Sequence, residues 1–486
     1  MGKIQIVQGK FDETTTFQNN LTANQVKYPD IQKVIQYAEP RMLSTLIVSG
    51  YGQTDYNMGK MKTKIGTIPA SDLIGSSGYK YLVQGRLQKA SIILGLVDTP
   101  TTGGVFSLRM KDNYLTPGMV AVFNSGILCR VLGLPTGSEG NFIYSFQTVG
   151  GTQFVYATDV ALQNGEKTCF GSYSSFSEGS LTGYSRGHYA EWFINHMTIQ
   201  RKTIGITGSA ASDVLWALYD GFKGWYFKKE RDAKIQFKIE DEFQKWFGES
   251  NMKNADGTAK DSSGQLDSAT GNEIIQGDGI IAQIKGINEI DGSGVNGVAT
   301  IEDINDMMTT LEKRSSSYEG KVWYVVTGTD GFRTFQDLLE DKQANKFNIQ
   351  ITKDGSLKPG GPDVQVGYNF MTYNYAGNQL ILIKHTLFDD EQRFTAKGVD
   401  GKILQSSQMI FLDMSPADGI SNIEIKSKGA YGINRAMQSV YLNGPTGMNM
   451  GNVVTGVDSL EYHMLKEDMV IIYNTRSCGI INKSAA

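Results

Sequence analysis

The spacing of hydrophobic and polar positions changes several times along the chain, and each change predicts a different element. Between 46 and 210, short apolar runs alternate with glycine-bearing turns, as is typical of β-strands. The turn spacing within 112–185 favours a small barrel or sandwich, and 76–110 and 188–207 predict a long two-stranded excursion that carries it. The expected strands are Tyr79–Leu82, Ser91–Val97, Val120–Phe123, Ile127–Leu132, Asn141–Thr148 and Thr152–Tyr156.

A helical period begins near residue 209. Ser209 or Ser212 is suited to cap a helix start, and Gly248 is suited to end it after Phe247. A helix over this whole stretch would be about 50 Å long. The apolar residues that follow the helical period are Leu215, Leu218, Tyr219, Phe222 and Tyr226.

Charged side chains are interleaved in the second half of this expected helix. Glu230–Lys234 and Asp241–Lys245 are acid-first pairs four residues apart, each contributing about 0.2–0.5 kcal/mol to an exposed helix. This patterning favours a solvated face with salt bridges over a phosphate-binding patch. The candidates for inter-subunit or core packing are Trp216, Trp225, Tyr226, Lys228, Lys229 and Arg231.

After the most loop-like segment, 249–273, the pattern becomes mixed α/β. Thr300 with Asp303 is a helix-start signal, and Val322–Val326 reads as a buried strand. The first helix has one apolar face, made of Ile301, Ile304, Met307, Met308 and Leu311. A second is lined by Phe332, Phe335, Leu338 and Leu339. Further strands are expected at Val364–Phe370, Leu380–Lys384, Gln408–Leu412, Ile423–Ile425 and Met469–Tyr473.

Composition narrows the class of protein. Glycine accounts for 56 of 486 residues and proline for only 10, which fits many tight turns and excludes collagen-like and proline-rich chains. The net charge of −4 gives no global basic field that would draw the protein onto nucleic acid. Three scattered cysteines argue against a disulfide framework, and synthesis in a reducing cytoplasm is expected. No apolar run reaches the length of a membrane span.

Motifs for catalysis or ligand binding are sparse. The usual zinc, nucleophile-elbow and P-loop patterns are missing, and we expect packing or hydrogen-bonding roles for the four histidines. Gly277-Asp-Gly279-Ile-Ile-Ala282 matches a dinucleotide-binding pattern, but Asp278 would repel the phosphates and no clear strand precedes it. A tight turn between the long helix and the next domain is the favoured interpretation, and no cofactor or metal is predicted.

The order of the elements is more informative than any motif. A polar arm precedes the β excursion, the long helix follows, and a loop leads to GDGIIAQIKGI, a helix, the strand VWYVV and a helix beginning TGTDGFRTFQDLLEDK. The chain ends in strands, with MVIIYNTRSCGIIN last. In this order the sequence resembles the major capsid proteins of tailed bacteriophages with the Hong Kong-97-type fold. It is most similar to those of crAss-like phages.

The resemblance implies an α+β tailed-phage capsid fold with an inserted small all-β domain. It divides the chain into an N-terminal arm (1–45), an E-loop and P-domain β excursion (46–111 and 186–208), an inserted β-barrel-like domain (112–185), a spine helix (209–248), an A-domain (249–430) and returning P-domain strands (431–486).

The resemblance also implies a function. The chain would be a non-enzymatic shell subunit that self-assembles into hexamers and pentamers of an icosahedral head, which is built in the host cytoplasm and encloses double-stranded DNA. Portal, scaffolding and auxiliary capsid proteins would be partners, DNA would be contacted non-specifically, and no membrane would be involved. One alternative is another virion structural protein, such as a tail tube, sheath or decoration protein. A carbohydrate-active protein is a second, suggested by 23 tyrosines and 5 tryptophans, although no carboxylate pair stands out.

Overall fold

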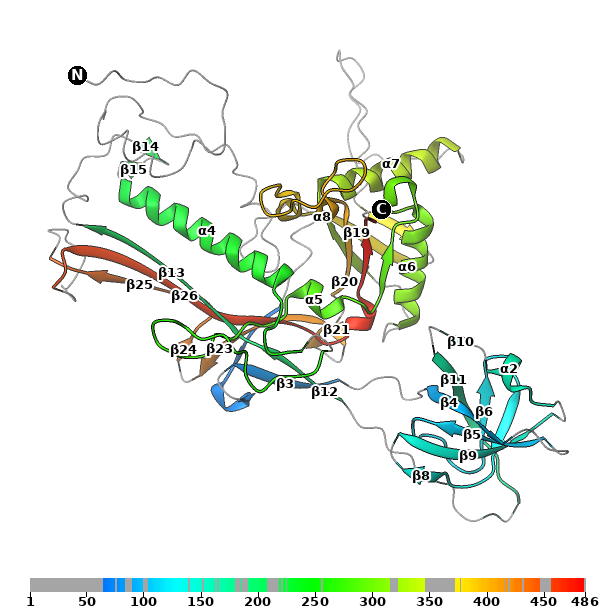
Figure 1. The fold of residues 1–486 in the computed structure, drawn as a ribbon. Helices are drawn as coiled ribbons and strands as arrows, with labels where there is room; N and C mark the ends of the chain where they lie inside the picture. The colour runs from blue at the N-terminus through cyan, green and yellow to red at the C-terminus, as the bar shows by residue number, and fades with distance from the viewer. Residues whose placement is uncertain are drawn as a thin grey trace. The chain divides into compact units, whose positions relative to one another are not determined.

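A computed structural model describes residues 64–484 with gaps, of which the longest are 208–217, 315–321, 346–371 and 446–455. The expected arm at 1–45 and the expected strand Val364–Phe370 lie outside the described residues. The chain divides into two compact units (Figure 1). The larger comprises Met1–Lys80 and Ile194–Ala486, and the smaller comprises Tyr81–Phe193.

The smaller unit contains a closed antiparallel β-barrel. Its strands follow the order β11-β4-β5-β9-β7-β6, and β6 pairs back with β11 to close the ring. Short β8 (Thr136–Ser138) and β10 (Leu162–Gln163) extend β9 and β11, and α2 (Tyr156–Asp159) is a single helical turn. The barrel strands are β4 (Ala90–Asp98), β5 (Val105–Met110), β6 (Met119–Phe123), β7 (Leu128–Val131), β9 (Asn141–Thr148) and β11 (Glu166–Ser174).

Aromatic side chains fill the barrel. Phe106 and Phe154 stack with ring centroids 3.8 Å apart, and Phe123 and Phe146 pack edge-on nearby. The expected strand at Thr152–Tyr156 is wrong, because residues 153–155 have no strand pairing. Phe154 enters the barrel core from this connection, so its hydrophobic character reflects burial rather than a ladder position.

The barrel is wider than the module expected at 112–185. It includes β4 and β5, which the sequence had placed in the excursion. β5 pairs with β9 from Val105 to Met110, and β4 pairs with β11. Without these two strands the ring would be open, so they belong to the barrel by hydrogen bonding.

The larger unit contains a sheet of order β1-β23-β26-β13, with β24 and β25 at its margins. Its central strand, β26, has 14 residues, and burial alternates from Ser459 to Lys466 with the even-numbered side chains buried. This part follows the pattern of a sheet covered on one side by another element, whereas from Lys466 to Ile472 both faces are buried. The strands are β1 (Lys64–Ile68), β13 (Thr198–Thr207), β23 (Ile423–Ala430), β24 (Ile433–Asn434), β25 (Gln438–Asn443) and β26 (Ser459–Ile472).

A second sheet of the larger unit, of order β16-β27-β20-β17-β19-β18, packs with α6 and α7. The Thr300–Asp303 start signal is confirmed, because each residue's side chain accepts from the other's backbone N–H. The expected apolar face of α6 is the buried one. The elements are β16 (Glu289–Asp291), α6 (Ile301–Arg314), β17 (Val322–Thr327), α7 (Thr329–Asn345), β18 (Thr372–Tyr375), β19 (Asn378–Lys384), β20 (Met409–Asp413) and β27 (Gly479–Asn482).

The remaining elements are short. β12 pairs with β3, and β3 pairs with β2, in a three-stranded sheet. The other short elements are single turns, two-residue strands and the six-residue strands β3 and β12. They are β2 (Leu73–Ile74), β3 (Gly78–Val83), β12 (Glu191–His196), α5 (Ile280–Ile284), α8 (Leu404–Ser407), β21 (Pro416–Ala417) and β22 (Ile420–Ser421), with 3-10 turns at Ala70–Asp72, Val295–Gly297, Thr386–Asp389 and Thr475–Ser477.

Helix α4 (Trp225–Phe247) begins later than expected. Instead of continuing the helix, β14 (Leu218–Tyr219) pairs with β15 (Phe222–Lys223). The two residues between these strands are an Asp-Gly pair, which favours a two-residue hairpin over a helix. The prediction of a continuous helix is therefore wrong at these two strands, while residues 209–217 lie outside the described residues. α4 is about 35 Å long.

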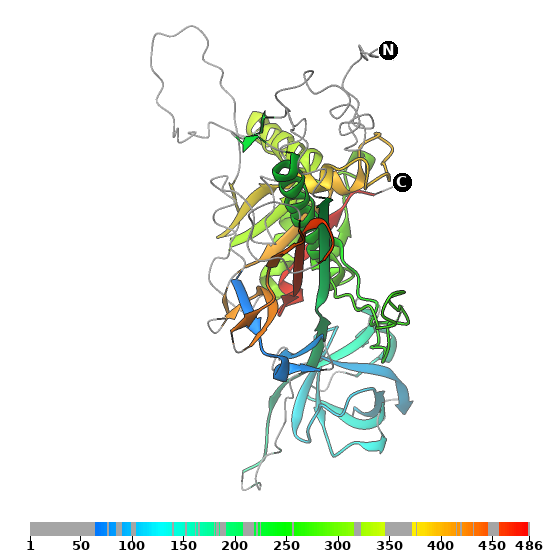
Figure 2. The ribbon, with the colours of Figure 1, turned by 90° about the vertical axis from the view of Figure 1, so that its left-hand side faces the viewer.

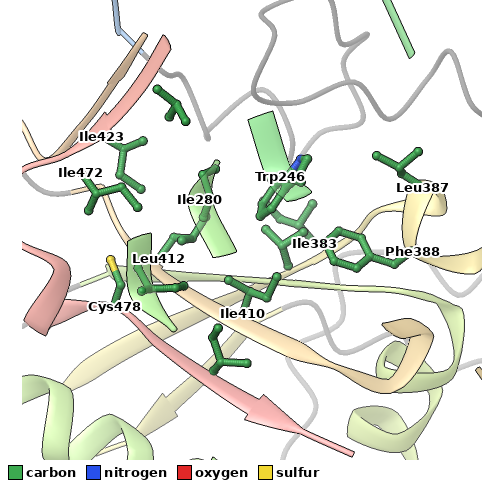
Figure 3. Close-up of a cluster of buried hydrophobic side chains, with 14 of the residues drawn as sticks. Trp246, Ile280, Ile383, Leu387, Phe388, Ile410, Leu412, Ile423, Ile472 and Cys478 are labelled. Carbon is green, nitrogen blue, oxygen red and sulfur yellow. The ribbon is translucent and has the colours of Figure 1, made fainter. Parts of the chain in front are cut away.

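The main core of the larger unit lies where α4, α5 and both sheets meet (Figure 3). Trp246 from the last turn of α4 and Ile280 from α5 pack with aliphatic side chains of β19, β20, β23 and β26. The same core therefore holds the two sheets together and fixes the C-terminal end of α4 between them.

Candidate architectural site: the anchored helix and its glycine junction

Four charged side chains connect α4 to the central strand β26. Asp241 and Lys245 lie one turn apart on the helix, and Lys466 and Asp468 lie on the strand face that points at it. Lys245 Nζ is 3.1 Å from Asp241 Oδ1 and also contacts Asp468. Lys466 Nζ is 2.8 Å from Asp468 Oδ2 and also contacts Asp241. Each lysine thus bridges both carboxylates, and we call this group the ionic quartet.

The ionic quartet is almost completely removed from solvent. Burial raises the pKa of Asp241, and the neighbouring carboxylate of Asp468 raises it further. Burial alone would also raise the pKa of Asp468, but the ammonium groups of Lys245 and Lys466 hold that pKa below its ordinary value. Desolvated charges are tolerated only when they are paired and hydrogen-bonded, so removal of one member would leave a costly unpaired charge.

Closer to the N-terminus of α4, the helix packs on the same sheet through apolar contacts. Ala233 and Phe237 meet Tyr462 and Met464 of β26 and Ile204 of β13. The helix therefore lies along β13 and β26 (Figure 1), and Figure 2 shows the same elements after a turn of 90°. The spacing 233, 237, 241 and 245 places the apolar and ionic contacts on one stripe of the helix.

A second polar contact joins α4 to the other sheet. Glu242 Oε1 accepts from Trp246 Nε1 at 2.8 Å and lies 3.2 Å from Nε2 of His385, which follows β19. His385 Nδ1 accepts from the backbone N–H of Leu387 at 3.1 Å. This bond requires Nδ1 to be unprotonated, so Nε2 carries the hydrogen and donates it to Glu242. His385 therefore has the hydrogen-bonding role expected for it.

The Gly277–Ala282 motif forms a close backbone junction. A Cβ on Gly277 would lie 1.9 Å from the carbonyl oxygen of His196, and a Cβ on Gly279 would lie 2.8 Å from that of Lys245. Gly279 also donates its N–H to the carbonyl of Gly248, just after α4. These glycines permit contact between the chain's own backbones, which supports the tight-turn interpretation of the motif.

Polar side chains complete this junction. Asn195 accepts from the backbone N–H of Asp278 at 2.9 Å and donates to the carbonyl of Val470 in β26 at 2.8 Å. Thr198 Oγ1 accepts from the N–H of Gly277 at 3.0 Å. The carboxylate of Asp278 pairs with Lys253. β12, β13, β26 and the segment after α4 are thus joined through hydrogen bonds within one chain.

The structure corrects the expected solvated face of α4. Asp241, Glu242 and Lys245 are buried, whereas the Glu230–Lys234 pair near the start of the helix is partly exposed. An acid-first pair looks the same in sequence whether it faces water or a second ion pair. The sequence analysis did not identify Lys466 and Asp468 as partners of the helix. The signal that could have indicated them is the triplet Lys-Glu-Asp at 466–468, which interrupts the otherwise apolar end of β26.

The candidate packing residues are located only in part. Trp216 lies outside the described residues, while Trp225, Tyr226, Lys228, Lys229 and Arg231 fall in the first two turns of α4. Their side chains are not among those described, so their packing role stays a prediction. In the described part of the chain, no three acidic, histidine or cysteine side chains are grouped as metal ligands would be. No described helix has the length and apolar character needed to span a membrane.

The long helix is anchored on one sheet and joined to the other, and its buried charged side chains are paired within the chain. The chain belongs to the Crassvirus major capsid protein family, whose model matches residues 33–486. It is accordingly a non-enzymatic structural protein of the virion, the major capsid protein of a crAss-like tailed phage, and forms homo-oligomeric shells. This membership decides against the tail-protein and carbohydrate-active alternatives.

The solved structures with remote likeness include chains from two phages and an encapsulin. A Microbacterium phage Oxtober96 chain is 11% identical with a TM-score of 0.33, covering 80% of this chain and 88% of that chain. A cyanophage Pam1 capsid chain is 10% identical with a TM-score of 0.34, at 65% and 83% coverage. A holo-SrpI encapsulin chain from Synechococcus elongatus is 7% identical with a TM-score of 0.33, at 61% and 78%. No curated protein matches. The family assignment rests on the sequence match.

Proposed function

We propose that copies of this chain form the hexamers and pentamers of an icosahedral head with the Hong Kong-97-type fold, enclosing double-stranded DNA. Portal, scaffolding and auxiliary capsid proteins are its expected partners, and the packaged DNA is contacted non-specifically. The near-neutral chain, with a net charge of −4, suits a wall that confines DNA without binding it tightly.

The two sheets of the larger unit suit different domains of the proposed subunit. α4 and the sheet of β1, β23, β26 and β13 are suited to be the P-domain with its spine helix. The second sheet, with α6 and α7, is suited to be the A-domain. β27 (Gly479–Asn482) pairs with β20 in this second sheet, so in this scheme the last strand of the chain belongs to the A-domain rather than to the expected returning P-domain strands at 431–486.

The observation that carries the proposal of subunit contacts is the exposure of large apolar side chains on β3 and β12. In the smaller unit, Leu82 is 50% exposed, Trp192 is 57% exposed and Phe193 is 46% exposed. β2 pairs only with Gly78 and Tyr79 of β3, so beyond these residues the sheet has two strands. Two paired strands have little stability in water without a surface to cover them. Aromatic residues are also enriched at subunit interfaces. In the proposed shell these strands belong to the E-loop and bury these side chains against a neighbouring copy.

The test is assembly of purified protein carrying Trp192→Ser and Phe193→Ser. Negative-stain microscopy and mass photometry should show loss of shells and of closed rings, because the variant removes apolar area from the interface. The matched control is Leu134→Ser, which changes an equally apolar side chain, 69% exposed, in the same unit. Unchanged shells from the double variant, or equal loss in the control, would contradict the proposed contact.

A further inference from the structure

The ionic quartet has the arrangement needed for a covalent reaction within the chain. We propose that the amine of Lys466 and the carboxyl of Asp241 condense into an amide bond that ties α4 to β26. This inference concerns the larger unit alone and does not depend on the proposed hexamers and pentamers.

The contacts assign one role to each member. Lys466 Nζ contacts Asp241 Oδ2, so the nucleophile and the acyl carbon are neighbours. Asp468 Oδ2 lies 2.8 Å from Lys466 Nζ and can accept a proton from the attacking amine. Lys245 Nζ lies 3.1 Å from Asp241 Oδ1, on the oxygen that would carry the negative charge of the tetrahedral intermediate. A nucleophile, an acyl group, a proton relay and a cationic stabiliser therefore meet at one point.

Burial makes this condensation more favourable than it is in water. A free ammonium and a free carboxylate are strongly hydrated, and that hydration opposes amide formation. In the ionic quartet both ions have already lost their water, so conversion to a neutral amide removes two desolvated charges. Held reactants also gain effective molarities of about 10⁵–10⁸ M when correctly aligned. Burial raises the pKa of Asp241, which favours the protonated carboxyl that an amine attacks.

The step balances within the quartet. Lys466 gives one ammonium proton to Asp468, which passes it to the carboxylate of Asp241. The neutral amine forms a bond from Nζ to Cγ of Asp241. A second proton then moves from the nitrogen through Asp468 to the departing oxygen, which leaves as water. Asp468 returns to its carboxylate form and stays paired with Lys245, so the site remains electrically neutral and no other reactant is required.

Intact-mass spectrometry of the full chain under denaturing conditions tests the proposal. We expect a mass one water molecule below that of the sequence. Trypsin should release residues 239–245 joined to residues 436–476, because an acylated Lys466 resists cleavage. Lys466→Arg keeps the charge but cannot form this amide, and Asp468→Asn removes the proton relay, so both variants should show the full sequence mass.

Two results would overturn the proposal. The first is the full sequence mass in the unmodified protein, both freshly purified and after assembly. The second is a lost water that maps to a cyclised Asp-Gly pair instead of the joined peptides. An Asp468→Asn protein that forms the same joined peptides in the same proportion would overturn the role of Asp468 as the proton relay. The first two measurements use the unmodified chain, so they decide even if a variant fails to fold.

Discussion

The barrel core and the contact between α4 and β26 are both fully buried, yet they are built from opposite chemistry. The barrel is filled by phenylalanines such as Phe106 and Phe154, whose burial is driven by the non-directional hydrophobic effect. The helix contact ends in an ionic quartet that requires every member. An apolar core tolerates changes of shape, whereas a buried charge network is either satisfied or costly. We therefore expect conservative substitutions in the barrel core to destabilise the protein less than substitutions in the ionic quartet.

The largest effect is expected at Lys245. Lys245→Ala leaves one buried carboxylate of the quartet without a cation, and such a change costs about 3–5 kcal/mol. Denaturant unfolding of the purified chain, followed by tryptophan fluorescence, measures it through Trp246 in the last turn of α4. The control is Lys202→Ala, whose partner Glu240 is exposed and whose loss should cost about 1 kcal/mol or less. If the free energy of unfolding fell equally in the two variants, the buried quartet would contribute no more to stability than an exposed ion pair.

An intermediate effect is expected at the glycine junction. Gly277→Ala places a Cβ against the carbonyl oxygen of His196, and the shifts needed to relieve such overpacking cost about 1–3 kcal/mol. Thermal unfolding of the variant provides the measurement. Gly456 has open space around its Cβ position, so Gly456→Ala is the control and should leave the melting temperature nearly unchanged. A Gly277→Ala chain as stable as its control would show that the junction can open.

A smaller effect is expected in the barrel. Phe154→Leu keeps an apolar side chain in the core but removes the ring stacked on Phe106, so it should cost less than the roughly 3–5 kcal/mol of a Phe→Ala truncation. Hydrogen exchange of the barrel strands is the appropriate readout, because it reports the smaller unit separately. The free energy of opening of the barrel could instead fall by as much as Lys245→Ala lowers the free energy of unfolding. The barrel would then depend on the exact shape of its core side chains as strongly as the contact between α4 and β26 depends on charge.

The smallest effect is expected for the barrel thiols. Burial raises the pKa of Cys129 to about 12, with a further contribution from Asp159, and burial also raises the pKa of Cys169. Since the thiolate is the reactive form, neither thiol should react with a disulfide reagent at pH 8 in the folded protein. Both should react once the chain is denatured. Rapid labelling of the native protein would show that the barrel opens readily.

Local patterns predicted those elements whose neighbours are close in sequence. The start of α6 at Thr300 and Asp303, its apolar face, and the strand β17 follow from periodicity and capping alone. The late start of α4 was missed although an Asp-Gly pair marked the hairpin, because the apolar residues also fitted a helical period. The membership of β4 and β5 in the barrel was missed because closure depends on distant partners.

The sequence by itself determined the order of elements, the near-neutral charge and the resemblance to phage capsid proteins. These depend on composition and on spacings of a few residues. Only the tertiary structure decided which charges are buried, because Asp241 and Lys466 are 225 residues apart and become partners only when α4 lies on β26. The same holds for Gly277, whose need for a small side chain arises from the carbonyl oxygen of His196 across the junction. Short-range spacing specifies elements, but the environment of a side chain is fixed by what the rest of the chain places beside it.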